Sequence, residues 1–227
     1  MSPDGDLRLT MKRDRDATSG KIVQAVGQLL AREGFRSLGL RAVAREAGVD
    51  KRLIYRYFGG LPELIKAYGR SEDFWWTVDA LVGENLAGPR EGTRAGWMAL
   101  VLRRHVEALR RRPLTQEILV WELSERNALT DELAKIRETR ARELVRYLSK
   151  RLGGRGPASW NAVGALLVAA TTYLVVRSRT FDFYAGVDLR RDKGWQQFEK
   201  AVNLITSRVF VDDAAHSRRT RRAGGKR

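Results

Sequence analysis

Several features are missing from the 227-residue chain: it has no cysteine, only two histidines and only five prolines. Without cysteine it forms neither disulfide bonds nor thiolate sites for zinc or iron–sulfur clusters, and we expect no metal and no cofactor. A chain without disulfides suits the cytoplasm, which is where we expect this protein. The scarcity of proline leaves room for long helices.

Long apolar segments are also scarce. The first sixteen residues, MSPDGDLRLTMKRDRD, lack the apolar region of a secretory signal. The longest apolar run covers residues 162–176. This is shorter than the roughly 18–20 apolar residues that cross a bilayer, so we interpret the run as a buried helix and expect no membrane partner.

Acidic residues are few compared with basic ones: 27 Asp and Glu face 43 Lys and Arg, which gives a net charge of +16. Only 9 of the basic residues are lysine, so a genome rich in arginine is one explanation of the excess. The other is a polyanionic partner, either nucleic acid or an anionic membrane. The positions of the charges must decide between them.

Helical periodicity is what the sequence does contain, and no run of alternating β-branched residues interrupts it. The first predicted helix places Ile22, Ala25, Val26, Leu29 and Leu30 on one face. Glycines and prolines fall at the predicted helix boundaries. The helices are expected over residues 17–33, 40–47, 51–58, 62–87 (with a break near Gly69 as an alternative), 93–112, 113–126, 129–152, 157–181 and 192–210.

The third predicted helix, residues 51–58, is too short to form alone in water, because helix nucleation is costly. Its apolar side consists of Leu53, Ile54, Tyr57 and Phe58, which must pack on the two helices before it. The opposite side presents the basic and tyrosine side chains outward: Lys51, Arg52, Tyr55 and Arg56. Two helices joined by a turn at Gly48 form a helix-turn-helix, whose second helix enters the DNA major groove.

The candidate DNA contacts differ in kind. Lys51 and Arg52 lie at the start of the helix, where side chains reach base edges, and arginine bonded to guanine is the commonest specific contact. Tyr55 and Arg56 suit phosphates, which fix the register of the protein on DNA. In the arm before the first helix, Arg13 and Arg15 are further candidates for phosphate or minor-groove contacts. An ordinary solvated charged face is the alternative interpretation of all these residues.

The stretch KIVQAVGQLLAREGFRSLGLRAVAREAGVDKRLIYRYFGGLPELIKAY resembles the N-terminal domain of TetR-family transcriptional regulators. The resemblance implies an all-α homodimer, with an N-terminal three-helix helix-turn-helix domain joined to a C-terminal antiparallel helical bundle that holds a small effector. The matching residues are Ile22, Ala25, Leu29, Gly34–Phe35, Val43–Ala44, Ala47–Gly48–Val49, Tyr55, Tyr57–Phe58 and Glu63–Leu64.

Three sites depart from the family pattern, and one of them is Leu53, where the family often has threonine and which we assign to packing. Leu38 and Gly39 replace the usual hydroxyl residue before the second helix, so the DNA contact of that helix is assigned to Arg41. Gly60 and Leu61 replace the usual Ser-Lys at the start of the fourth helix, where a backbone N–H can still face a phosphate. The predicted DNA-binding residues are Arg41, Lys51, Arg52, Tyr55, Arg56 and Tyr57.

The resemblance also implies a domain organisation. Residues 1–16 are expected to be a flexible basic arm and 17–62 the helix-turn-helix domain. Residues 63–211 are expected to bind the effector and to dimerise through the last two long helices, and 212–227 to form a disordered basic tail. An ordinary intrachain core is the alternative interpretation of the last two helices.

The effector pocket has no motif of its own. Aromatic walls with a few polar groups suit small molecules, although most tryptophans of a protein belong to its core. Glu122 suits a cationic ligand, whereas Arg104 and His105 suit an acidic one, so the charge of the effector stays open. The candidates are Trp97, Trp121, Glu122, Arg104, His105 and Tyr173.

The sequence therefore favours a DNA-binding transcriptional regulator, most simply a repressor released from a palindromic operator by a small molecule and associated with the nucleoid. A sequence-tolerant DNA-binding protein without an effector is the alternative, motivated by the net charge. An enzyme is not expected, because the chain has neither a Gly-rich phosphate loop nor a nucleophile elbow.

Overall fold

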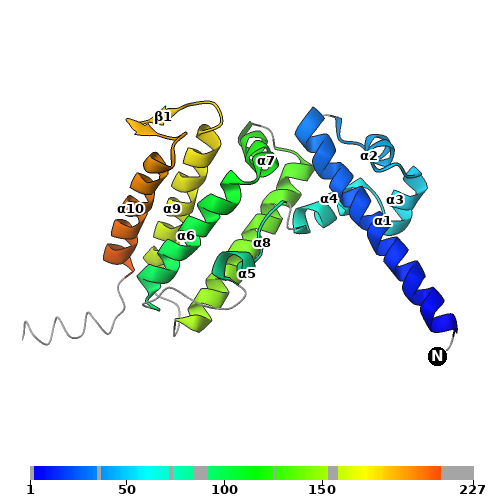
Figure 1. Ribbon diagram of the computed structural model, residues 1–227, viewed down its shortest axis with the longest axis horizontal. Coiled ribbons are helices and arrows are strands. Elements are labelled where there is room, and N and C mark those ends of the chain that lie inside the picture. The colour runs from blue at the N-terminus through cyan, green and yellow to red at the C-terminus, as the bar shows by residue number, and fades with distance from the viewer. Residues whose placement is uncertain are drawn as a thin grey trace, which may run out of the picture. The chain divides into compact units, whose positions relative to one another are not determined.

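The chain divides into two compact units. One contains the chain up to Trp75 together with Glu117–Thr139, and the other contains Trp76–Gln116 together with the chain from Arg140 onward. The computed structural model describes residues 3–34, 37–71, 74–83, 92–124, 126–152 and 158–210. Within them the fold is helical, as predicted (Figure 1).

The first unit is built on four N-terminal helices: α1 (Pro3–Glu33), α2 (Leu40–Ala47), α3 (Lys51–Phe58) and α4 (Leu61–Arg70). Helix α1 packs against α2 and α4, and α3 packs against the same two helices. The predicted apolar face of α1 is confirmed, because all five of its members are at most 1% exposed. This face and the buried side chain of Ile54 anchor the short helices, which would not persist alone.

Local signals set the ends of α2 and α3, and both predicted ranges are confirmed. Gly48 ends α2 with a φ of 65°, a backbone conformation that favours glycine. The side chain of Asp50 then caps α3 by accepting the backbone N–H of Arg52 at 2.7 Å. Together they form the turn of a helix-turn-helix.

Helix α1 starts earlier than predicted. It begins at Pro3, so residues 3–16, which the sequence assigned to a flexible arm, are helical. Proline is well tolerated in the first helical turn, and polar side chains do not prevent a helix from extending away from its packed part. The predicted basic tail, residues 212–227, lies outside the described residues, as does Phe35.

The helix predicted over residues 62–87 does break near Gly69, which is the alternative that the sequence offered. Helix α4 ends at Arg70, and the next helix, α5, covers only Val78–Val82. Phe74 and Trp76 lie between them and are both buried. Consecutive large rings cannot all share one helix face, so the chain leaves the helix in order to bury them.

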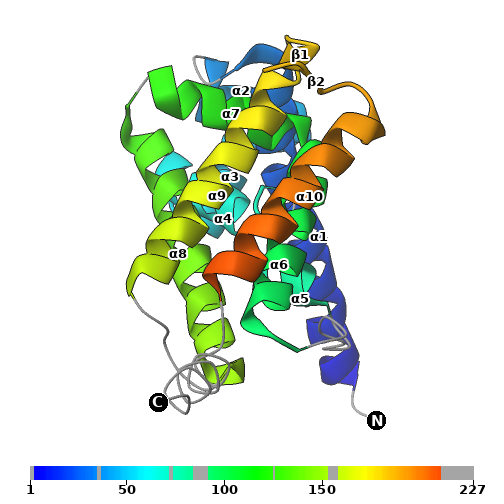
Figure 2. The ribbon, with the colours of Figure 1, turned by 90° about the vertical axis from the view of Figure 1, so that its left-hand side faces the viewer.

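The second unit surrounds α6 (Arg94–Arg110), which packs against α5, α9 (Ala158–Arg177) and α10 (Asp192–Val209). Figure 2 looks onto α9 and α10. A hairpin of β1 (Phe183–Tyr184) and β2 (Val187–Asp188) joins these helices. The sequence did not predict it, because two-residue strands are too short to show alternation.

Two further helices contribute to both units: α7 (Pro113–Ser124) and α8 (Ala128–Arg151). The starts of α6 to α10 fall within one residue of the predicted positions. At three of these boundaries the sequence supplies the signal, because Thr93 caps α6 by accepting the N–H of Gly96 at 3.1 Å, Pro113 opens α7 and Asn127 caps α8.

Helix α9 is less enclosed than predicted. The segment Ser159–Arg177 is long and apolar enough to cross a membrane by composition alone, with a mean hydropathy of 1.5, yet only 22% of it is buried. The sequence predicted a helix buried on several sides. Within one chain α6 covers part of it, and Leu166 stays 68% exposed. The remaining apolar side is available to a partner.

Candidate DNA interface and effector cavity

Helix α3 carries its chemistry on one side, as predicted. Lys51, Arg52, Tyr55 and Arg56 are exposed, with Tyr55 at 54%, whereas Ile54 on the opposite side is fully buried. The apolar side is fixed by packing on α2 and α4. The exposed side therefore has a defined orientation, as a helix that reads DNA requires.

The cations of α3 are not neutralised by the protein. In the described part of the chain, neither Lys51, Arg52 nor Arg56 forms an ion pair with a carboxylate. Arg32 on α1 is different: it donates two N–H groups to the carboxylate of Glu46 on α2, at 3.0 and 2.7 Å. These hydrogen bonds raise the pKa of Arg32 and lower the pKa of Glu46. The exposed cations of α3 thus remain available for an external anion.

Tyr57 lies beneath two arginines. The guanidinium carbon of Arg56 is 5.2 Å from the centroid of its ring, and that of Arg15 on α1 is 5.4 Å away. Arg56 also donates an N–H to the Tyr57 hydroxyl at 3.4 Å. The half-buried ring therefore positions two cations beside the recognition helix, and Arg15 reaches this group from outside the helix-turn-helix.

Two other parts of the predicted DNA surface are also present. Arg41 is exposed on the first turn of α2. Gly60 precedes α4, and no side chain caps the start of this helix. No cap therefore accepts the backbone N–H groups of its first turn. Such helix starts favour anions.

The six residues predicted to bind an effector are divided between the two units. Trp121 and Glu122 belong to the first unit, where Trp121 packs against Gly34 and Glu122 forms an ion pair with Arg137. The ion pair neutralises the charge of Glu122, which is therefore unavailable to a cationic ligand. The other four belong to the second unit and point to different surroundings there: Trp97, Arg104, His105 and Tyr173.

Each of these four has its own environment. Trp97 is buried edge-on to Tyr147, with ring centroids 6.4 Å apart. Arg104 donates an N–H to the carbonyl of Leu81 at 2.9 Å. Tyr173 is 48% exposed on α9. None of these residues lines the apolar cavity between α6, α8 and α9 that is described below.

His105 is a core residue. It is 3% exposed, its Nε2 lies 2.9 Å from the hydroxyl oxygen of Thr172, and its ring meets Trp76 edge-on. Burial lowers the pKa of His105 to about 4. The imidazole is therefore neutral at physiological pH, which does not suit it to bind an acidic ligand by charge.

An apolar cavity of about 390 Å³ lies between α6, α8 and α9. Its walls include Met98, Leu148 and Val168. Gly164 also lines it, and a Cβ at this position would lie 3.3 Å from the terminal carbon of Met98. At its edge Arg94 packs over the ring of Trp160 at 5.0 Å and donates an N–H to the carbonyl of Leu152 at 2.7 Å. The size and lining suit a small apolar molecule.

The sequence missed this cavity. Its lining comes from three helices separated by up to about fifty residues, and each side chain fits the same periodicity as an ordinary core residue. Trp160 and Phe210 are its aromatic residues, and neither was among the predicted pocket residues. No local motif marks the empty space.

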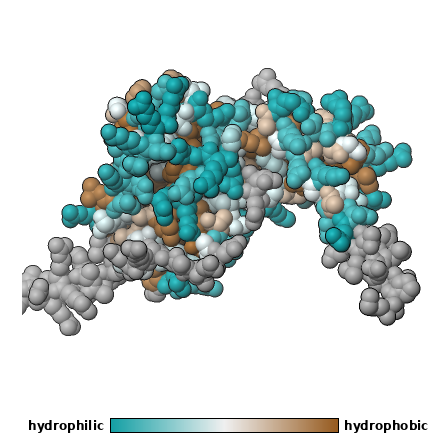
Figure 3. All heavy atoms as spheres, in the orientation of Figure 1, coloured by the Kyte–Doolittle hydropathy of each residue, from teal (hydrophilic) through white to brown (hydrophobic). Residues whose placement is uncertain are grey.

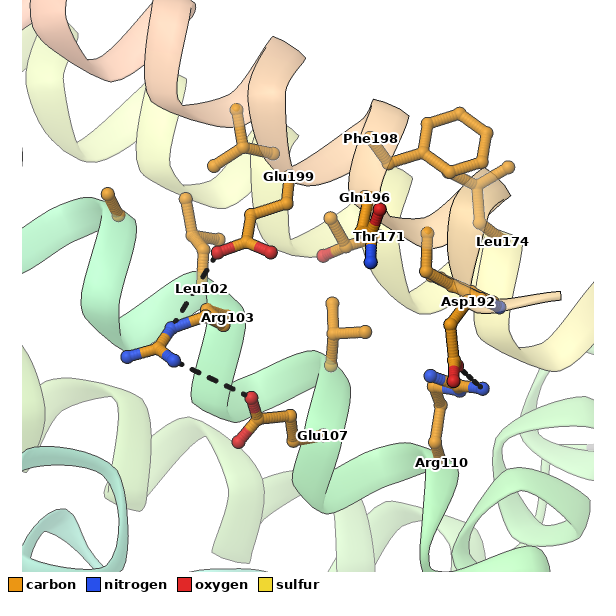
Figure 4. A pocket seen from close by; sticks show the side chains of 14 residues that line it. Leu102, Arg103, Glu107, Arg110, Thr171, Leu174, Asp192, Gln196, Phe198 and Glu199 are labelled. Carbon is orange, nitrogen blue, oxygen red and sulfur yellow. Dashed lines mark hydrogen bonds and ion pairs between the residues drawn. The ribbon is translucent and has the colours of Figure 1, made fainter. Parts of the chain in front are cut away.

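A smaller cavity of about 180 Å³ lies between α6 and α10 (Figure 4). Its apolar side chains include Leu102 and Phe198, and hydrophobic atoms show between hydrophilic ones over these helices (Figure 3). Ion pairs cross its opening: Arg103 lies 3.9 Å from Glu199, and Arg110 lies 3.5 Å from Asp192. These pairs join α10 to α6, so we assign the groove to helix packing.

The fold and the exposed face of α3 define a helix-turn-helix DNA-binding protein with a second helical unit. Residues 22–68 match the family model described as bacterial regulatory proteins, tetR family. Over these residues the chain is similar to the DNA-binding domain of the tetR family, and its fold matches those of TetR-family regulators. Comparison with curated protein sequences gives no match.

Solved structures with the same fold come from several bacteria. A TetR-family regulator from Streptomyces coelicolor is 21% identical, with a TM-score of 0.56 over 85% of this chain and 99% of that one. GusR of Salmonella enterica is 16% identical, with a TM-score of 0.58 over 86% and 95%. NalD of Pseudomonas aeruginosa, the secondary repressor of the MexAB-OprM multidrug efflux pump, is 18% identical, with a TM-score of 0.56 over 88% and 98%. These likenesses show the fold.

Proposed function

We propose that this regulator is a homodimeric repressor that binds a palindromic operator and leaves it when a small apolar molecule binds. The observation that carries the DNA-binding part is the oriented, unneutralised face of α3. Lys51 and Arg52 are placed to reach base edges in the major groove, while Tyr55 and Arg56 bind phosphates. Arg41 and Arg15 add phosphate contacts from α2 and α1.

A dimer suits the proposed palindromic operator. One eight-residue recognition helix contacts few base pairs, and two-fold related copies read two half-sites about one helical turn apart. The exposed apolar side of α9 is the natural surface for pairing. The TetR-like fold, shared with the repressor NalD, supports the repressor role.

We place the effector in the cavity between α6, α8 and α9. Its apolar lining predicts a largely apolar effector, and Arg94, Ser149 and Asn161 are its polar groups. A ligand releases DNA only by binding more tightly to the conformation that does not fit the operator. The cavity provides such a difference if its helices move apart or together when it is filled.

The experiment is a titration of the full-length protein with DNA from beside its own gene that contains an inverted repeat, compared with a scrambled duplex at several salt concentrations. A specific regulator prefers the repeat at every salt concentration. Equal affinities with the same steep salt dependence would instead establish the sequence-tolerant alternative. Small apolar compounds added to the same assay test release, and no release by any compound that binds the protein would contradict the effector role.

A further inference from the structure

The hairpin between α9 and α10 exposes aromatic side chains. Phe183 is 60% exposed and Phe181 51%, and the ring of Tyr184 lies 5.7 Å from that of Tyr173 on α9. The guanidinium carbon of Arg177 lies 4.1 Å from the Phe181 ring centroid and 5.6 Å from that of Tyr184. We call these five residues the aromatic cluster. Contiguous exposed patches of this kind mark interaction surfaces.

The hairpin is held firmly to the start of α10. The N–H of Leu189 donates to the carbonyl of Asp182 at 2.7 Å, and the indole N–H of Trp195 donates to the carbonyl of Leu189 at 2.8 Å. Asp182 also forms an ion pair with Arg190. Gly194 lies so close to the Asp188 carbonyl that a Cβ there would be 1.6 Å from its oxygen.

Such fixed rings lose little conformational entropy on binding, which makes them effective interface residues. At the hairpin tip Ala185 has a φ of 48° and Gly186 a φ of 81°. These values match the tight turn that holds two short strands together. The aromatic side chains are therefore presented by a rigid element.

The aromatic cluster continues the exposed side of α9. Leu166, Ala169, Ala170 and Tyr173 are exposed at helical spacing, and the last of them belongs to the cluster. Figure 2 shows the hairpin at one end of α9 and α10. Helix side and hairpin thus form one surface.

The charge pattern indicates what covers this surface. The chain carries a net charge of +16, so two copies repel each other unless they meet through a region without charge. Residues 159–176 contain no Asp, Glu, Lys or Arg. This stretch of α9 therefore offers no cation to DNA, and Arg177 at its end lies over the rings of Phe181 and Tyr184. Tyrosine, phenylalanine and arginine are the side chains enriched in protein interfaces.

We propose that the hairpin is a dimerisation element: its aromatic cluster docks on a second copy of the chain and extends the contact made by α9. This inference rests on the proposed homodimer and adds to it a specific element. In a two-fold dimer the same surface serves both copies, so each hairpin contacts the partner and the interface gains two aromatic clusters.

The test replaces Phe183 and Tyr184 by serine together and measures the dimer dissociation constant by sedimentation velocity over a concentration series. We expect it to rise at least tenfold, with an unchanged circular dichroism spectrum because both rings are exposed. Tyr55→Ser is the matched control, since it removes an exposed tyrosine from α3 and leaves the dimer intact. Leu166→Ser, on α9 itself, provides the scale for a loss within the helix contact.

The outcomes separate the two proposals. A wild-type protein that stays monomeric at all concentrations refutes the proposed homodimer, and the hairpin inference fails with it. A wild-type dimer that the double variant does not weaken overturns only the hairpin inference. Binding of monomeric wild-type protein to phosphatidylcholine–phosphatidylglycerol vesicles, lost in the double variant, would also overturn it, because the cluster would then serve a membrane.

Discussion

The guanidinium carbon of Arg15 lies 5.4 Å from the centroid of the Tyr57 ring, and this contact joins α1 to the recognition helix α3. Arg15 is exposed and has no carboxylate partner among the described residues. A cation held over an aromatic ring keeps its charge and loses mobility. Arg15 therefore extends the basic surface of the helix-turn-helix in a fixed position.

We expect Arg15→Ala to weaken binding to operator and scrambled DNA by similar factors and to reduce the slope of log affinity against log salt by about one, as the loss of one phosphate contact does. The measurement is fluorescence anisotropy at several salt concentrations. Arg13→Ala removes an exposed arginine of the same helix that has no ring beneath it, and should have a smaller effect. Equal effects of the two variants would show that the Tyr57 contact is irrelevant.

Arg52→Ala should behave differently. If Arg52 forms hydrogen bonds with a base edge, its removal weakens binding to the operator by about 1–3 kcal/mol. Binding to scrambled DNA should weaken much less, so the specificity for the operator falls. The quantity to compare is the ratio of the two affinities at fixed salt. Arg146→Ala, which removes an exposed arginine of α8, serves as the control for lost charge. An unchanged ratio would exclude Arg52 from base recognition.

The cavity between α6, α8 and α9 can be filled by mutation. Val145 lines it from α8, and Val145→Trp should occupy the space and abolish release of DNA by an apolar effector while operator binding persists. Arg146→Trp adds the same ring at the neighbouring exposed position, which does not line the cavity. Normal induction of the Val145→Trp protein would place the effector elsewhere.

His105 predicts a pH dependence of stability. Its folded pKa of about 4 lies below the ordinary value of 6.5, so the unfolded chain takes up the proton first as the pH falls. The stability held above pH 6.5 is therefore lost between pH 6.5 and 4, by about 3 kcal/mol for this group. The free energy of unfolding, measured with urea at several pH values across this range, should fall less steeply with decreasing pH for His105→Gln than for the wild type. An identical pH dependence of the two proteins would contradict the assignment.

Gly194→Ala should destabilise the second unit. The added Cβ would approach the backbone oxygen of Asp188 to 1.6 Å, and a backbone atom cannot rotate away as a side chain does. We expect a loss of about 2 kcal/mol or more in the free energy of unfolding. Gly20→Ala in α1 meets nothing within 4 Å and should be neutral or stabilising by up to about 1 kcal/mol. Thermal denaturation of both variants provides the comparison.

The sequence alone determined the DNA-binding unit because its signals are local. Gly48 ends α2 and Asp50 caps α3. Within the eight residues of α3, helical periodicity puts Ile54 and Arg52 on opposite sides. Each of these depends on neighbours within a few residues, so the bounds of α2 and α3 and the face exposed by α3 were predictable.

Only the tertiary structure decided the rest. The placement of Arg15 over Tyr57 joins residues forty-two positions apart, and the effector cavity is space left among α6, α8 and α9. Tryptophans suggested a pocket by composition, yet Trp97 is packed in the core and Trp121 lies in the other unit. Periodicity states which side of a helix is apolar, but whether that side meets a core, a cavity or a second chain depends on long-range packing.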